Sequence, residues 1–410
     1  MHVGHVLRRW PARRTALLLI CAAVFISYID RTNIAVAAVA MRRMFGWSET
    51  QKGLVLSAFY VGYIALMLPS AGLANRFGGR VVLGAAVAWW SIFTVLTPIA
   101  AFGALPLLVA ARIALGLGEA AVFPASINLI GSSMPPSQRS RAVALLISSL
   151  HIGTLFALPA TGWLVQTYGW PIPFYAFGAV GLLWTAVWFA WMRPEARAEP
   201  STAGAREPIP WGTLLRLPAV WAIVAGHFSS NWMLYVTSAW LPTYLSSTFG
   251  VSVGNAGLLS AAPSLCSFAA ANAAGFAADR LLSRGCSATW VRKLMQTSGL
   301  GAGAVFLLLL TGAESIAMAL VFLCCAAGSV SLTTAGFAPN GLDIAPRYAD
   351  VIYGISNTFA TLPGIAGVFL TGWMVDRTGS FVAPFFVTAG VALVGAAIFL
   401  VFASGKRQID

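Results

Sequence analysis

The sequence contains twelve apolar runs that are each long enough to cross a lipid bilayer as a helix. An α-helix rises about 1.5 Å per residue, so about 20 mainly apolar residues span the hydrocarbon core. In that core a protein must satisfy its own backbone N–H and C=O groups, and an α-helix does so within one segment. The runs therefore predict an all-α membrane protein. The expected spans are residues 15–39, 53–74, 81–101, 105–130, 142–166, 173–192, 219–247, 254–278, 294–312, 315–341, 351–375 and 381–403.

Charged residues are rare in this chain, and their placement limits its function. Only 9% of residues are charged and 59% are hydrophobic, whereas about a quarter of the residues of a soluble domain are charged. The net charge is +13, but the basic residues lie in short segments between the apolar runs, which excludes a nucleic-acid-binding protein. The five cysteines show no metal-binding or redox spacing. We expect neither a metal nor a cofactor.

The distribution of Arg and Lys predicts the orientation in the membrane, because basic residues are enriched in cytoplasmic segments. If the N-terminus is cytoplasmic, nineteen basic residues lie inside, and only Arg42, Arg43, Lys52 and Arg377 lie outside. We therefore expect a multi-pass protein of the cytoplasmic (inner) membrane with both termini in the cytoplasm. Arginines precede the first run as in a signal peptide, but no small-residue cleavage site follows it, so we expect an uncleaved first helix.

The two halves of the sequence resemble each other. FGWSETQKGLVLSA from Phe45 is similar to FGVSVGNAGLLSA from Phe249, and TGWLVQTYG from Thr161 is similar to TGWMVDRTG from Thr371. A third pair, LANRFGGR and AADRLLSRG, keeps the same order and spacing. The repeat is therefore parallel and six helices long. The expected parts are an N-terminal six-helix bundle at residues 1–192, a cytoplasmic linker at residues 193–218 and a C-terminal six-helix bundle at residues 219–410.

This parallel repeat of six helices resembles the organisation of the major facilitator superfamily. The loop AGLANRFGGR is similar to the signature between its second and third helices, Gly-x-Leu-Ala-Asp-Arg-x-Gly-Arg, which latches the cytoplasmic gate. The loop departs from the signature at Ala71 and Asn75, whereas the second copy, GFAADR, retains Gly275 and Asp279. The resemblance implies a gate motif that consists of Asn75, Arg76, Gly78, Arg80, Asp279 and Arg280.

Further motifs resemble the anion:cation symporter branch of that superfamily. YIDRTNIAVA is similar to its first-helix Arg-x-Asn-x-x-Val-Ala pattern, and RIALGLGEAAVFPA is similar to its fourth-helix Arg-x-x-x-Gly-x-x-Glu pattern. HFSSNWMLYVTSAWLPTYL and DIAPRYADVIYGISNTFATLPG resemble its seventh and eleventh helices. This branch includes bacterial sugar-acid (galactonate):proton symporters and the animal vesicular glutamate, sialic acid and type I phosphate transporters.

Four ionisable groups lie deep in the predicted spans: Asp30 and Arg31 in the first, and Arg112 and Glu119 in the fourth. A charge at the bilayer centre costs at least about 2.5 kcal/mol, so such groups are usually functional. The alternative is that these four groups only neutralise one another between packed helices. Arg112 and Glu119 share a helix face about 10.5 Å apart, which is too far to pair along a straight helix. Asp30 could reach Arg112 instead, and a carboxylate substrate could compete for that arginine.

Carboxyl groups can take up and release protons, whereas arginine keeps its charge. The resemblance to bacterial sugar-acid symporters implies the same division of roles. Asp30 and Glu119 would carry protons, and Arg31 would bind the substrate carboxylate. Arg112 would be a second anion clamp or a switch partner.

Five further polar side chains are weaker candidates. The family resemblance implies that Tyr28, Tyr63 and Asn357 hydrogen-bond the substrate, and packing with a satisfied hydroxyl is the alternative for each tyrosine. His151, in the fifth span, could bind substrate or contact a neighbouring helix. We interpret His227, in the seventh span, as a helix-contact residue.

The sequence thus predicts a monomeric secondary transporter that imports a small organic anion with protons by alternating access, in a bacterial membrane. Ser230 and Ile127 stand where vesicular glutamate carriers have Arg and His. The missing positive charges favour a monocarboxylate, such as a sugar acid, over a dicarboxylate. Transport of phosphate or of an aromatic acid, and uncoupled uniport, remain alternatives. A sensor would add a soluble output domain, and an enzyme would show a nucleophile and base or a metal set; the sequence indicates neither.

Overall fold

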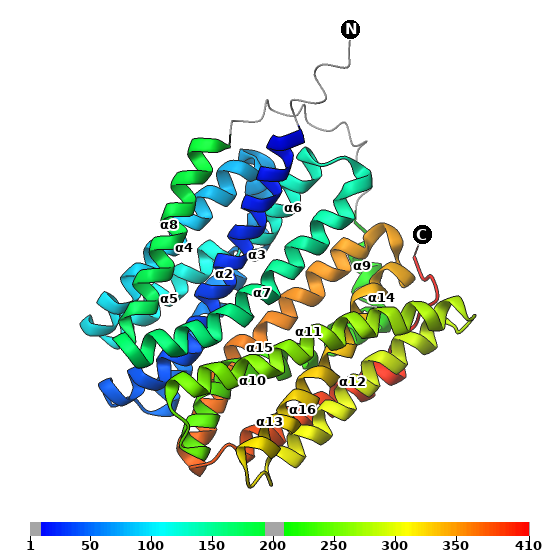
Figure 1. The fold of residues 1–410 in the computed structure, drawn as a ribbon. Helices are drawn as coiled ribbons and strands as arrows, with labels where there is room; N and C mark the ends of the chain where they lie inside the picture. The colour runs from blue at the N-terminus through cyan, green and yellow to red at the C-terminus, as the bar shows by residue number, and fades with distance from the viewer. Residues whose placement is uncertain (1–9, 193–208, 410) are drawn as a thin grey trace. The chain divides into compact units, whose positions relative to one another are not determined.

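The computed structural model describes residues 10–192 and 209–409, and these residues form helices and no strand (Figure 1). By backbone proximity the chain divides into two compact units. Unit 1 contains the described residues up to 40 and from 58 to 192. Unit 2 contains residues 41–57 and the described residues from 209 onward. A short segment near the N-terminus therefore belongs to the C-terminal unit.

In unit 1, α4 packs along both α5 and α8 (Figure 1). The buried Trp188 of α8 donates from Nε1 to the carbonyl of Arg80 on α4, at 3.0 Å. The helices of this unit, with the ends of the first two reaching into unit 2, are α2 (Trp10–Phe45), α3 (Glu49–Phe77), α4 (Gly79–Gly103), α5 (Leu105–Glu119), α6 (Val122–Ser133), α7 (Pro136–Tyr168) and α8 (Pro171–Trp191).

Unit 2 is built around α10, which packs along α15 and α16. The predicted linker, residues 193–218, lies mostly outside the described residues, and its described end forms the short helix α9. The domain boundaries that the sequence suggested therefore stay a prediction. The helices of this unit are α9 (Trp211–Leu214), α10 (Pro218–Phe249), α11 (Val253–Ser283), α12 (Ala288–Leu310), α13 (Ile316–Ser331), η1 (Leu332–Ala335), α14 (Phe337–Ile344), η2 (Pro346–Tyr348), α15 (Ala349–Thr378) and α16 (Val382–Phe402).

The spans match the sequence prediction in number and in order. Within the described residues, eleven helical segments are long and apolar enough to cross a membrane. The predicted seventh span is α10, which is 32 residues long but more polar, and it completes the expected twelve. Large apolar side chains such as Leu18 and Phe276 are exposed on the protein, as expected for surfaces that face lipid. The prediction of an all-α membrane protein is confirmed.

The fourth predicted span, 105–130, is broken directly after Glu119. α5 ends at Glu119, and α6 begins three residues later. Pro124 explains the break, because it has no N–H to donate to the carbonyl of Ala120 four residues earlier. The fully buried Ser70 hydroxyl of α3 lies 3.3 Å from that carbonyl, and it also lies 2.7 Å from the Met67 carbonyl of its own helix. Glu119 thus lies at the C-terminal end of a helix.

The tenth predicted span, 315–341, is broken as well. α13 continues into the 3-10 turn η1, and α14 begins after Gly336. The buried amide of Gln296 on α12 accepts the Phe337 N–H at 3.2 Å and donates to the Gly226 carbonyl of α10 at 3.1 Å. Both units therefore break the helix at the same place in the repeat. At each break, a polar side chain from another helix contacts a backbone group.

Residues 41–57, here called the strap, join α2 to α3 and pack against α10 and α15. Glu49 forms ion pairs with Lys52 and with Arg42, the latter at 2.9 Å. The Lys52 side chain is fully buried, donates to Thr243 at 3.1 Å and lies 4.6 Å from the centre of the Trp240 ring. A buried ammonium is tolerated only when it has such partners.

Asp376 on α15 caps the start of α3. Its carboxylate accepts the backbone N–H groups of Glu49 and Thr50, at 2.8 and 2.6 Å. A negative charge is favourable at this end of a helix. Gly372, one turn earlier on α15, permits the contact, because a Cβ there would lie 2.3 Å from the Glu49 carbonyl oxygen. Three of the four basic residues predicted to lie outside are part of the strap.

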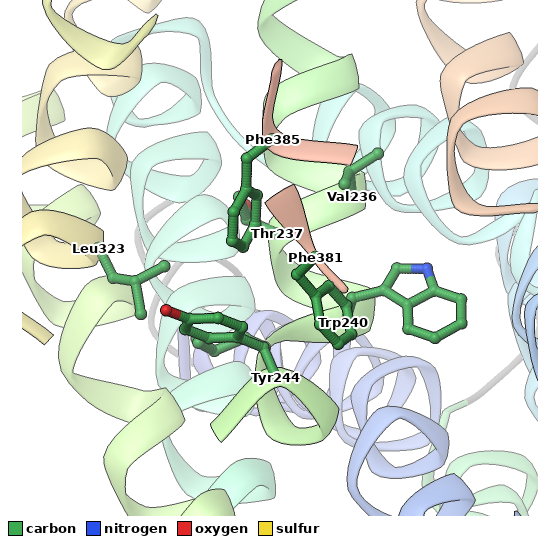
Figure 2. Close-up of a pocket in the computed structure, with 8 residues that line it drawn as sticks. Val236, Thr237, Trp240, Tyr244, Leu323, Phe381 and Phe385 are labelled. Carbon is green, nitrogen blue, oxygen red and sulfur yellow. The ribbon is translucent and has the colours of Figure 1, made fainter. Parts of the chain in front are cut away.

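A small apolar cavity in unit 2 lies between α10, α13 and the start of α16 (Figure 2). Half of its lining residues are aromatic: Trp240, Tyr244, Phe381 and Phe385. The cavity has about 10 Å³ of space, which is the limit for one water molecule. It is too small for an organic anion. A larger hollow of about 380 Å³ at the start of α11 is lined by no charged side chain, so the candidate site is sought among the buried charges.

Candidate functional site

Asp30 lies near the middle of α2 and is completely buried. One carboxylate oxygen, Oδ2, accepts a hydrogen bond from Trp90 Nε1 of α4 at 3.1 Å. The other, Oδ1, has no hydrogen-bond partner among the described residues. Leaving a buried carboxylate half-satisfied is costly, so this geometry suits a group that takes up a proton or a ligand.

Glu119, the last residue of α5, has the same arrangement. It is 2% exposed, and its Oε2 accepts a hydrogen bond from Ser27 on α2 at 3.1 Å. Its Oε1 has no partner in the described part of the chain. Ser27 lies one turn before Asp30 on α2, so α2 contacts one carboxylate and carries the other.

Arg112 lies two turns before Glu119 on α5 and is 1% exposed. Two of its guanidinium nitrogens, Nε and Nη1, have no hydrogen-bond partner within the described residues. A buried arginine with unused donors is a ready site for a carboxylate or phosphate, which it binds through parallel hydrogen bonds.

Arg31 follows Asp30 on α2 and is surrounded by aromatic rings. Its guanidinium carbon lies 4.9 to 5.7 Å from the ring centres of Tyr28, Phe59, Tyr60 and Tyr63. Cation–π contacts of this kind hold a guanidinium without neutralising its charge. Arg31 is half-buried and keeps its positive charge.

Unit 1 therefore brings together six of the residues expected at the site: Tyr28, Asp30, Arg31, Tyr63, Arg112 and Glu119. Asp30 could have paired directly with Arg112, but within the described residues neither Asp30 nor Glu119 forms an ion pair with Arg112 within 4.0 Å. Asp30 is bonded to Trp90 of α4. The roles assigned to these side chains stay predictions.

Three further candidates are His151, Asn357 and His227. His151 is half-buried on α7 in unit 1, and Asn357 is half-buried on α15 in unit 2. His227 of α10 is buried, stacks 4.1 Å from the ring centre of Phe337 and hydrogen-bonds Ser356 at 3.2 Å. This environment fits the interpretation of His227 as a helix contact.

The gate residues of unit 1 lie where α3 turns into α4. Gly78 has φ of +83°, which a residue with a side chain rarely adopts. Asn75 accepts a hydrogen bond from the Asn128 side chain at 3.0 Å, and Asn128 accepts the Gly79 N–H at 3.2 Å. Arg80 donates to backbone carbonyls at the end of α8. The remaining gate residues are Arg76, which lies 5.2 Å from the Phe77 ring centre, and Asp279 and Arg280, which are exposed on α11.

Sequence reasoning missed several residues of this site. Ser27 and Trp90 bond the two carboxylates, and Phe59 lies beside Arg31. Asn33, one turn after Asp30, is fully buried, and neither atom of its amide group has a partner among the described residues. A signal existed for Ser27 and Asn33, because both lie three residues from Asp30 and so share its helix face. Trp90 and Phe59 have no such signal, because their contacts depend on tertiary packing.

Comparisons with known proteins identify the family. The Major Facilitator Superfamily profile matches residues 20–368. The chain belongs to the Major Facilitator Superfamily. Two solved structures have this fold: a bacterial homologue of the human lysosomal transporter Spinster (TM-score 0.77, 19% identity, 96% of each chain) and the D-xylose–proton symporter (TM-score 0.75, 17% identity, 96% of this chain and 99% of that one).

Within this superfamily the similar proteins are anion transporters. The probable anion transporter 4 of Oryza sativa subsp. japonica is 37% identical over 98% of this chain and 70% of that protein. The ascorbate transporter of Arabidopsis thaliana is also 37% identical, over 98% and 77%. The sodium-dependent phosphate transport protein 1 of Arabidopsis thaliana is 35% identical, over 98% and 81%. All three are named as chloroplastic, and all are transporters rather than enzymes. The resemblance to the anion:cation symporter family is confirmed.

Proposed function

We propose that this protein is a proton-coupled symporter that imports a small organic anion, most suitably a monocarboxylate such as a sugar acid. The observation that carries the proposal is the pair of buried carboxylates, Asp30 and Glu119, each with one oxygen bonded and one without a partner among the described residues. Both lie in the same unit as Arg112, whose unused donors can receive an anion.

The proposed cycle follows from the chemistry of these groups. Protons load onto Asp30 and Glu119 in the outward-open state, which leaves Arg31 and Arg112 without competing negative charge. The substrate carboxylate then binds to Arg31, with Arg112 as the second clamp. The two bundles rock, the substrate leaves, and the protons are released to the cytoplasm. Coupling arises because a charged carboxylate and the substrate compete for the same arginines.

The peripheral groups complete the proposal. Tyr28, Tyr63, His151 and Asn357 would hydrogen-bond the rest of the substrate. The loop from Asn75 to Arg80, with Asp279 and Arg280, would close the cytoplasmic side. The excess of Arg and Lys in alternate segments supports cytoplasmic termini. We propose that the transporter works as a monomer in a bacterial inner membrane.

Phosphate transport is the second candidate. Two arginines in one unit also suit a phosphate group, and one relative is named as a sodium-dependent phosphate transporter. The relative named as an ascorbate transporter favours an organic anion. Aromatic-acid transport and uncoupled uniport are further alternatives. Stabilisation by benzoate in the screen below would indicate the first, and uptake that does not depend on a proton gradient would indicate the second.

A thermal-shift screen of the purified protein tests the anion site. The probes are gluconate, lactate, ascorbate, benzoate and inorganic phosphate, and a ligand that binds the folded state raises the unfolding temperature. We expect a monocarboxylate to stabilise the wild type and to lose its effect in Arg31→Ala. The matched control is Arg139→Ala, which removes a basic side chain from the N-terminal part of α7, over one hundred residues from Arg31 in sequence. This variant should respond to the anion as the wild type does. Stabilisation by phosphate alone would replace the carboxylate proposal, and an equal response of Arg31→Ala would remove Arg31 from the site.

A further inference from the structure

Two guanidinium groups lie over the ring of one phenylalanine, Phe59 on α3. The guanidinium carbon of Arg31 is 4.9 Å from the centre of this ring, and that of Arg112 is 5.6 Å from it. The Phe59 side chain is 1% exposed. A cation is attracted to the negative face of an aromatic ring, and the attraction is stronger away from water. Phe59 thus contacts both arginines at once, although they come from different helices.

The position of this ring is fixed by the backbone contact between α3 and α5. A Cβ on Gly116 would lie 2.0 Å from the Phe59 carbonyl oxygen, and a Cβ on Gly62 would lie 1.9 Å from the Ile113 carbonyl oxygen. The two backbones therefore touch at glycines on both sides. Gly116 lies one turn after Arg112 on α5, so the same contact sets the ring and Arg112 relative to each other.

Two neighbouring aromatic rings pack against the Phe59 ring. Its ring packs edge-on against Tyr60 at 5.3 Å between centres and lies 5.7 Å from the ring of Tyr63. Tyr60 and Tyr63 both contact Arg31 in turn. The Phe59 ring also contacts Arg112.

We propose that Phe59 is a positioning residue that holds Arg31 and Arg112 as a pair for one anion. Two like charges repel strongly in a poorly hydrated site, and long arginine side chains lose freedom when an anion orders them. The shared ring attracts both guanidinium groups, so they are held in place before the anion arrives and less ordering remains to be done on binding. The inference rests on the proposed function, because it concerns the affinity of the same anion site.

The test separates the electronic role of the ring from its shape. Phe59 is replaced by 3,4,5-trifluorophenylalanine, which keeps the ring but weakens its negative face, and in a second protein by Leu, which removes the ring. The same two replacements at Phe174, a fully buried ring of α8 that packs against Trp170, serve as matched controls. The dissociation constant is measured by calorimetry for whichever of gluconate, lactate, ascorbate, benzoate and phosphate stabilises the wild type most.

We expect the dissociation constant to rise about tenfold in Phe59→Leu and by a smaller factor in the fluorinated protein. In proteoliposomes the same change should appear in KM, with the maximal rate within about twofold of the wild type. The Phe174 proteins should bind as the wild type does. An unchanged dissociation constant in the fluorinated Phe59 protein would overturn the positioning role. Absence of any anion binding by the wild type would instead overturn the proposed function, and this inference with it.

Discussion

Asp30 and Glu119 are the residues on which proton coupling depends. Each accepts one hydrogen bond, from Trp90 and from Ser27 respectively, and retains one oxygen without a partner among the described residues. Amides in their place can still accept these hydrogen bonds but cannot bind a proton and change charge. The sequence could locate both carboxylates, because a charge in an apolar run is conspicuous. It could not identify their partners, since these come from other helices.

A substitution at Arg112 should separate stability from transport. Arg112→Met removes a buried guanidinium that has two nitrogens without partners and replaces it with an apolar side chain of similar length. Replacing a poorly satisfied buried charge by an apolar group is often neutral or stabilising. We expect an unfolding temperature at least equal to that of the wild type together with loss of anion uptake. The measurements are thermal unfolding in detergent and uptake in proteoliposomes. Retained uptake would exclude Arg112 from the anion site.

At the scale of elements, the break between α5 and α6 and the strap are the two features that sequence periodicity did not reveal. The apolar run from 105 to 130 continues through the break, and Pro124 is its only mark. The run does not show that the Ser70 hydroxyl lies within hydrogen-bond distance of the Ala120 carbonyl. The strap escapes prediction for a related reason. The Asp376 cap joins segments over three hundred residues apart in sequence, and Lys52 bonds Thr243 on α10. Local pattern carries no information on such contacts.

The helix break leads to a prediction for Pro124→Ala. The alanine restores an N–H that can bond to the Ala120 carbonyl, so α5 and α6 can join. We expect a higher unfolding temperature and a maximal uptake rate that is lower by about threefold or more, because Glu119 loses its place at a helix end. Pro98→Ala inside α4 is the control and should change stability without a comparable loss of rate. Equal rates in the wild type and in Pro124→Ala would show that the break has no part in transport.

The strap leads to a prediction for Lys52→Met. Removing one partner of a buried ion pair typically costs about 3 to 5 kcal/mol, because the other charge stays buried. Glu49 keeps only Arg42 in this variant, so we expect a clearly lower unfolding temperature. Adding Glu49→Gln should restore part of the loss, since the unpaired charge is then gone. Arg42→Met, which changes a side chain that is 42% exposed, should cost less than about 1 kcal/mol. A Lys52→Met protein as stable as the Arg42→Met protein would show that the buried pair contributes little.

At the scale of the whole molecule, the sequence predicted the class of fold, the order of the spans and the superfamily. These follow from the apolar runs and from motifs that lie within single segments, such as YIDRTNIAVA and RIALGLGEAAVFPA. The geometry of the site was less accessible from sequence. The partner of Asp30 is Trp90 of α4, and the place of Phe59 depends on the packing of α3 on α5. The substrate depends on side chains from several helices together, which explains why sequence favours an anion without naming it.

Uptake driven by a pH gradient tests the central claim most directly. The protein is reconstituted into proteoliposomes, and accumulation of the stabilising anion is measured with and without an inwardly directed proton gradient. The wild type should concentrate the anion only with the gradient, and Asp30→Asn combined with Glu119→Gln should abolish this while still exchanging labelled for unlabelled anion. Glu314→Gln, which changes an exposed carboxylate between α12 and α13, should behave as the wild type does. Gradient-driven accumulation that persists in the double variant would contradict the account.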